Sequence, residues 1–259
     1  MVRILWITDI HADKKTEKEK EELLCRLEAA RSDVLFLTGD IAEGEITALF
    51  LEDLWERFRK PVFFVLGNHD YHGSFLEDKR RDFSEKYSKD LVYLPSMEGV
   101  DLGNGRGLVG IDNWYNLLDH PEREQRLEDF EAVLDFQGCD KKVLESICQE
   151  LCDKAIEELD LKLKKAFASY REIDILMHVP PFYPRLIYGE MGAKDPFAFC
   201  WSCHPLGQFL MGQLKKHPHI SVRIFSGHTH KKGFYKPLSN LEVRIGNPAS
   251  CIQIANSFA

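Results

Sequence analysis

Aspartate, histidine and asparagine residues occur in five short clusters that are spread over most of the chain. The clusters are Asp9-Ile-His11, Gly-Asp40, Gly-Asn68-His69-Asp70, His178 and Gly-His228-Thr-His230. Imidazole and carboxylate groups suit zinc, manganese and iron, whereas calcium prefers oxygen ligands throughout its shell. With His69 and Asp70 set aside, seven potential ligands remain, which exceeds what one four-coordinate ion uses. The pattern therefore predicts two divalent ions (manganese, iron or zinc) that share one carboxylate.

Two such ions would create a local positive charge in a protein that is acidic overall. Their charge exceeds that of Asp9, Asp40 and one bridging hydroxide together, although the chain carries a formal net charge of −8. Ions about 3.5–4 Å apart polarise phosphoryl oxygens and lower the pKa of bound water. We therefore predict a metal-bound hydroxide that attacks a phosphoester. The residues alone do not distinguish Asp9 from Asp40 as the shared ligand.

The elements that must position these clusters alternate between strand and helix in the first half of the chain. Apolar runs predict strands at 2–7, 33–37 and 62–66, and apolar residues at helical spacing predict helices at 14–30 and 45–58. This order predicts right-handed parallel crossovers. Shorter strands are predicted at 91–94, 107–111, 173–177, 222–225, 233–235, 243–245 and 251–254. We therefore expect two packed sheets with helices outside.

Each cluster follows the end of a predicted strand, where ligands of parallel sheets gather. Two residues separated by one position in extended chain point the same way, so Asp9 with His11, and His228 with His230, can each aim at one place. Gly39, Gly67 and Gly227 stand directly before Asp40, Asn68 and His228. A glycine there permits a tight turn and close backbone approach.

The stretch 112–170 is polar and rich in helical patterns. Asp140 is a candidate N-cap for a long helix with one apolar side. The preceding segment predicts a helix that places Leu127, Phe130 and Leu134 together. We interpret these helices as covering one side of the core, with a cap over a cleft or a partner surface as alternatives. The chain is predicted to be one domain over 1–259 with this helical insertion.

Composition excludes several classes of protein. The chain has 259 residues, of which 44% are hydrophobic and 29% charged, which is typical of a globular protein. The net charge of −8 argues against binding of long nucleic acid or anionic lipid. The apolar runs are strand-sized, and the N-terminus lacks the pattern of a signal peptide. Seven irregularly spaced cysteines predict no disulfide framework, so we expect a cytoplasmic protein.

Taken in order from Asp9 to His230, the clusters resemble the motifs of the calcineurin-like metallophosphoesterase superfamily. The resemblance implies an α/β fold, a four-layer α/β/β/α sandwich of two mixed sheets with flanking helices. It also implies that one metal is bound by Asp9, His11 and His230, the other by Asn68, His178 and His228, and both by Asp40.

The resemblance further implies the catalytic groups. His69 would be the general acid for the leaving oxygen or a donor to the phosphate, and Asp70 would orient it. The protein phosphatase branch has an arginine shortly after its second motif, whereas Asp40 is followed here by Ile-Ala-Glu-Gly-Glu. We therefore expect a small phosphodiester or phosphomonoester, with phosphodiesterase favoured over protein phosphatase activity. A non-catalytic interaction module on the same fold, or a nuclease, is the alternative.

Residues near the ligands along the chain are candidates for substrate contacts. They are Trp114, Phe182, Arg185 and His204, which could stack on an aromatic group or pair with a phosphate. Core packing or surface placement explains each equally well. Cys200-Trp-Ser-Cys203-His204 matches the covalent haem attachment pattern, which we interpret as accidental because no export signal is visible.

Overall fold

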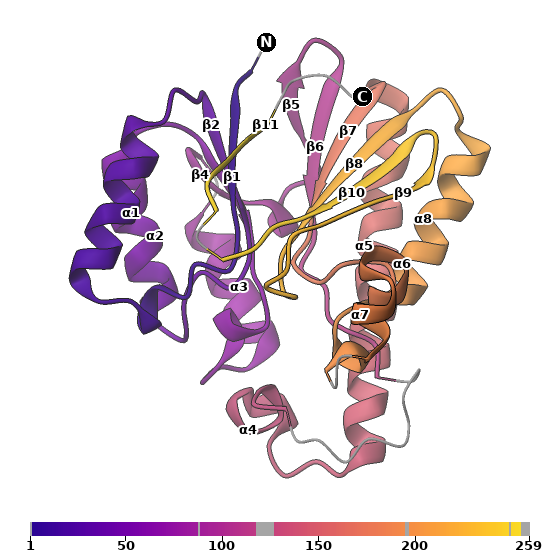
Figure 1. Cartoon of the computed structure of the whole chain (residues 1–259), viewed down its shortest axis with the longest axis horizontal. Coiled ribbons are helices and arrows are strands. Elements are labelled where there is room, and N and C mark those ends of the chain that lie inside the picture. Colours follow the sequence, from indigo (N-terminus) through magenta and orange to yellow (C-terminus); the bar gives the residue numbers. More distant parts are fainter. Residues whose placement is uncertain (1, 88, 118–126, 195–196, 249, 255–259) are drawn as a thin grey trace.

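Two β-sheets lie face to face, with helices on the outer side of each (Figure 1). The computed structural model describes residues 2–87, 89–117, 127–194, 197–248 and 250–254. The observed strands overlap every predicted one. The prediction of a four-layer α/β/β/α sandwich with two mixed sheets is therefore confirmed.

The first sheet is parallel except at one edge. In sheet order its strands are β11 (Ile252–Ile254), β1 (Ile4–Ile7), β2 (Val34–Thr38), β3 (Val62–Val65) and β4 (Leu91–Tyr93), with β11 antiparallel to β1. The helices between them are α1 (Glu17–Ala29), α2 (Ile46–Phe58) and α3 (Leu76–Lys86). The capping box of Thr16 and Glu19 fixes the start of α1.

The second sheet is likewise mixed. In sheet order its strands are β5 (Val100–Gly103), β6 (Arg106–Gly110), β7 (Glu172–Leu176), β8 (Ser221–Ser226), β10 (Leu241–Ile245) and β9 (Gly233–Leu238). Its two edge strands β5 and β9 are antiparallel to their neighbours. The helices of this half are α4 (Asp129–Ala132), α5 (Lys141–Ser169), α6 (Pro184–Tyr188), α7 (Glu190–Lys194) and α8 (His204–Lys216).

Strand β1 shows why its sequence is apolar at every position. Ile4 and Trp6 pack into the core between the sheets, where the Trp6 ring lies 5.1 Å from that of Phe225 on β8. Leu5 and Ile7 pack into the core under the helices. Successive side chains of a strand point to opposite faces, so a strand covered on both faces buries all of them.

The helix pattern of 112–170 is only partly as predicted. Asp140 caps α5, because its side chain accepts a hydrogen bond from the Val143 amide over 3.0 Å, and α5 packs beside the second sheet and α8 (Figure 1). The predicted helix before it is wrong, since only the short α4 and a 3₁₀ turn at Leu134–Phe136 form there. Residues 118–126 of this stretch lie outside the described residues.

Five helices and strands were not predicted: α3, α6, α7, α8 and β5. Helix α3 is strongly polar and buries only Leu76, Lys79 and Phe83, so its apolar signal is weak. In α8 the apolar spacing of Leu206, Leu210 and Leu214 was a usable signal.

Among the described residues, no helix combines the length and apolar character required to cross a membrane.

Candidate metal centre

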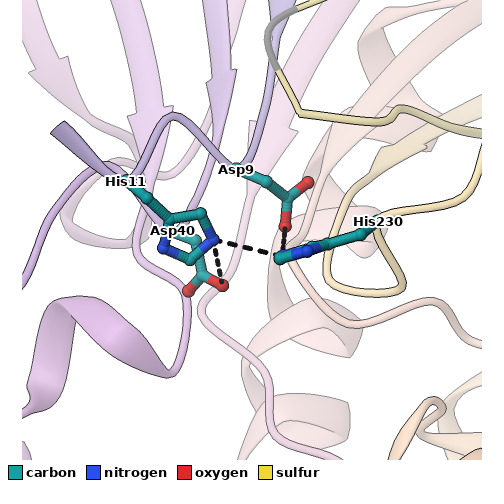
Figure 2. Close-up of side chains that lie close together, drawn as sticks. All are labelled: Asp9, His11, Asp40 and His230. Atoms are coloured by element: carbon teal, nitrogen blue, oxygen red, sulfur yellow. Dashed lines mark hydrogen bonds and ion pairs between the residues drawn. The ribbon is translucent and has the colours of Figure 1, made fainter. Parts of the chain in front are cut away.

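The ends of strands β1, β2, β3, β7 and β8 bring the predicted ligands together. Asp9, His11, Asp40 and His230 each offer one ligand atom, and these atoms lie within 4.8 Å of one another. Figure 2 shows their side chains pointing toward a common space. The His11 and His230 Nε2 atoms are 3.1 Å apart, and His230 Nε2 is 3.5 Å from Asp9 Oδ1. The His230 side chain is 50% exposed, so the cluster opens to solvent on this side.

A second group of ligand atoms adjoins the first and shares Asp40 with it. Asp40, His178 and His228 again place ligand atoms within 4.8 Å of one another. Asp40 Oδ2 lies 3.7 Å from His11 Nε2 in the first group and 3.2 Å from His178 Nε2 in the second. Asn68 Oδ1 lies 2.9 Å from His228 Nδ1, which adds the fourth predicted ligand. The tertiary structure therefore singles out Asp40, rather than Asp9, as the carboxylate between the groups.

In the second group, hydrogen bonds on the far side of the His178 and His228 rings fix which nitrogen faces the shared space. His178 Nδ1 donates to the Thr38 carbonyl over 2.7 Å, and His228 Nε2 donates to the Cys200 carbonyl over 2.8 Å. Within the described part of the chain, Asp9 Oδ2 is buried without a hydrogen-bond partner, and His178 Nε2 has no hydrogen bond but lies 3.2 Å from the Asp40 carboxylate. Buried polar atoms without partners are rare in folded proteins. Cations at these atoms would satisfy them, so the residues fit the implied metals.

The backbone at the cluster is held in a conformation that side chains rarely adopt. Seven non-glycine residues in the described ranges have positive φ, and five of them are predicted ligands with φ between 46° and 70°: Asp9, His11, Asp40, His228 and His230. Such backbone persists where the surrounding structure enforces it, and it concentrates at functional sites.

The predicted close approach at the glycines holds in the structure. Gly39 has a φ of +81°, and a Cβ atom there would lie 2.6 Å from both His178 Nδ1 and the Gly67 amide nitrogen. A Cβ on Gly227 would collide with Thr8 and Asp9. Any larger residue at these positions would push the ligand loops apart.

The electrostatics of the cluster favour an added cation. Burial raises the pKa of the Asp9 carboxyl to about 7. Burial also lowers the pKa of His178, but the Asp40 and Asp9 carboxylates outweigh it and raise the value to about 10. Without metal, a proton on His178 therefore balances the buried carboxylates. A divalent cation would displace this proton, because only neutral imidazole binds a metal.

His69 lies beside the cluster and is oriented by Glu43. Its Nδ1 is 3.1 Å from Glu43 Oε1, and its backbone amide donates to Asp40 Oδ1 over 3.0 Å. The predicted role of Asp70 is wrong. Its fully buried carboxylate instead accepts hydrogen bonds from the Gly67, Ile41 and Ala42 amides and the Thr47 hydroxyl, over 2.8–3.1 Å. Asp70 therefore joins the loops that follow β2 and β3, and sequence adjacency misassigned it.

Replacing Glu43 with glutamine is expected to lower kcat about tenfold, because one charge-assisted hydrogen bond to His69 is lost. The glutamine still fills the position but removes the negative charge from His69 Nδ1. Steady-state kinetics on the metal-loaded protein measures the change. An unchanged kcat would show that Glu43 does not act on His69.

Replacing Asp70 with alanine is expected to cost about 3 kcal/mol of stability, because three buried amides lose their acceptor. Urea unfolding of the variant and the wild type measures the difference. Asp82→Ala on the exposed side of α3 is the matched control and should change stability little. Equal stability of Asp70→Ala and the control would refute the structural role.

Asp129 and its neighbours form a buried support for Asn68 that was not predicted. Asp129 Oδ1 accepts from Asn68 Nδ2 over 2.9 Å and from His72 Nε2 over 2.8 Å, and Oδ2 accepts from the Tyr115 hydroxyl over 2.7 Å. This arrangement turns the side-chain oxygen Oδ1 of Asn68 toward His228. Asp129 lies 61 positions from Asn68 and belongs to no recognisable motif, so only its place in the fold reveals it.

Replacing Asp129 with alanine is expected to weaken binding of the metal that Asn68 is predicted to hold by about 10–100-fold, because a group that orients a predicted ligand is lost. Manganese titration of the metal-free protein by calorimetry measures the affinity. Asp153→Ala on the exposed face of α5 is the control. Tight binding in both variants would contradict the role of Asp129.

The structure separates the four predicted substrate contacts. Trp114 and Phe182 are 3% and 1% exposed and pack in the hydrophobic core, so their prediction as substrate contacts is wrong and core packing explains them. Arg185 is exposed on α6, and the His204 ring stacks on Tyr183 with centroids 3.8 Å apart. These two remain predictions.

Known proteins share this architecture. The family model for calcineurin-like phosphoesterases matches residues 2–232. Phosphopantetheinyl hydrolase (PptH) from Mycobacterium tuberculosis has a similar structure, with a TM-score of 0.66, 14% identity, and coverage of 98% of this chain and 96% of that one. A dimetal phosphatase from Danio rerio gives a TM-score of 0.58 at 12% identity, covering 96% and 88%. The search of curated proteins found no match.

A four-layer sandwich with histidine, aspartate and asparagine side chains at its strand ends defines the class of metallophosphoesterases. The family match spans most of the sequence, and the similar structures share the fold. The chain belongs to the calcineurin-like phosphoesterase family.

Proposed function

We propose that this chain hydrolyses a small phosphoester at a centre of two divalent metal ions. The observation that carries the proposal is that Asp40 belongs to two adjoining groups of ligand atoms. Asp9, His11 and His230 would hold one ion, and Asn68, His178 and His228 the other. When bound, such ions lower the pKa of water and polarise phosphoryl oxygens.

Residues beside the metal ligands would supply the remaining chemistry. Because His69 Nδ1 faces Glu43, its Nε2 is free to donate a proton to the leaving oxygen. The Glu43 carboxylate would stabilise the protonated imidazole before that transfer. The attacking oxygen comes from water rather than a side chain, so no covalent phospho-enzyme is expected.

Two features favour a small phosphodiester or phosphomonoester as substrate. Asp40 is followed by Ile-Ala-Glu-Gly-Glu, without the arginine that the protein phosphatase pattern places shortly after this motif, which argues against a phosphoprotein substrate. The net charge of −8 disfavours long nucleic acid and therefore a nuclease. The seven cysteines all lie among the described residues and form no disulfide, and we propose a cytoplasmic location on this basis.

Metal analysis combined with hydrolysis assays tests the proposal. The protein is stripped with a chelator, reloaded with manganese, and assayed on bis(4-nitrophenyl) phosphate and 4-nitrophenyl phosphate. We expect two ions per chain and metal-dependent hydrolysis, faster on the diester. At most one ion together with no hydrolysis would reject the enzyme and favour the non-catalytic interaction module.

A further inference from the structure

A third cluster of potential ligands adjoins the proposed dinuclear centre. Glu43, His69 and His72 place ligand atoms within 4.8 Å of one another. Glu43 Oε1 is 3.1 Å from His69 Nδ1 and 3.7 Å from His72 Nδ1. Bonds of about 2.0–2.2 Å to a tetrahedral zinc ion place its ligand atoms roughly 3.3–3.6 Å apart. The two distances to Glu43 Oε1 lie on either side of this range, and the ligand atoms of the two histidines lie within 4.8 Å of each other, so the three atoms are close enough to share one ion after a shift of the rings.

Local structure explains why the two histidines point to one place. His69–Tyr71 forms a 3₁₀ turn, and His72 follows as its C-terminal residue. Side chains three positions apart are aligned in a 3₁₀ turn, and the His69 and His72 rings lie 4.5 Å apart. Glu43 reaches them from the loop after β2.

The state of His72 points independently to a cation. Its side chain is 4% exposed, and Nε2 donates to Asp129 Oδ1 over 2.8 Å. Nδ1 is buried and has no hydrogen-bond partner in the described structure. A carboxylate that holds the proton on one ring nitrogen, with the other nitrogen free, is the usual arrangement of metal-binding histidine. The free Nδ1 of His72 faces Glu43.

We propose that Glu43, His69 and His72 form a zinc site that inhibits the enzyme, distinct from the dinuclear centre. Two imidazoles and one carboxylate, with water as a fourth ligand, suit zinc. The inhibitory effect rests on the proposed function, because an ion on His69 Nδ1 replaces the proton that Glu43 holds there and stops His69 from acting as an acid. Lys14 Nζ lies 2.9 Å from Glu43 Oε1, with half of its side chain exposed. Lys14 therefore competes with zinc and sets the concentration at which the site fills.

Zinc titration of the manganese-loaded protein tests the site. After gel filtration, the wild type is expected to keep one zinc ion per chain beyond its manganese, and saturating zinc should lower kcat about 10²-fold. His72→Gln retains a donor toward Asp129 but lacks a free ring nitrogen, so it should lose this extra zinc and its inhibition. Lys14→Met should lower the half-inhibitory zinc concentration about tenfold, because a competing charge is removed.

The two variants move zinc sensitivity in opposite directions, so misfolding of one cannot produce the expected result. The site is rejected if zinc displaces manganese one for one, if His72→Gln keeps the wild-type zinc content, or if Lys14→Met shows wild-type sensitivity. The zinc count does not require activity. An extra zinc ion in wild type but not in His72→Gln, without any hydrolysis, would support the site and reject the proposed function.

Discussion

Replacing Asp40 with asparagine is expected to reduce kcat on the order of 10³-fold, because the change affects both proposed metal positions at once. Asp40 Oδ2 lies between His11 of one group and His178 of the other. Asparagine keeps the size of the side chain but removes the charge that two cations would share. We therefore expect weaker binding of the second ion and less precise positioning of the first.

Metal content and rate, measured on the same sample, check this expectation. The Asp40→Asn protein should retain at most one manganese ion per chain after gel filtration, and circular dichroism should show a folded protein. Asp82→Asn on the exposed side of α3 is the matched control and should behave as the wild type. Two retained ions with a nearly normal rate in Asp40→Asn would disprove the shared position.

Replacing His69 with glutamine is expected to lower kcat about 10²–10⁴-fold while the metal content stays unchanged. The side chain of His69 is in neither of the two groups that share Asp40, so the ions should remain bound. The loss should be larger for an alkyl phosphodiester than for a nitrophenyl one. An alkoxide needs a proton in order to leave, whereas nitrophenolate leaves readily without one.

Comparison of the two substrates separates proton donation from simple phosphate binding. His219→Gln is the matched control, since His219 is exposed and lies in the segment between α8 and β8. It should leave both rates unchanged. An equal loss on both substrates for His69→Gln would argue against a general acid and in favour of a donor to the phosphate. Full activity would remove His69 from the mechanism.

The local pattern of the chain was sufficient to predict the layers and the place of the site. Alternation of apolar strands with helical segments indicates a parallel sheet, and the clusters stand where its strands end. The glycines before Asp40 and His228 predicted the close approach of the ligand loops that the structure shows. Asp140, as a candidate N-cap, predicted the start of α5. Each of these features depends on neighbours within a few positions, and the sequence records such neighbours directly.

Partners distant in the chain became visible only in three dimensions. Asp70 is adjacent to His69 in sequence, yet Glu43, 26 positions away, contacts the ring. Likewise Asp129 supports Asn68 across 61 positions. Such contacts depend on how separate loops cross at the ends of the strands, and no periodicity encodes that crossing. The packing of these loops therefore decides which carboxylate lies between the two groups of ligand atoms and which one contacts the His69 ring.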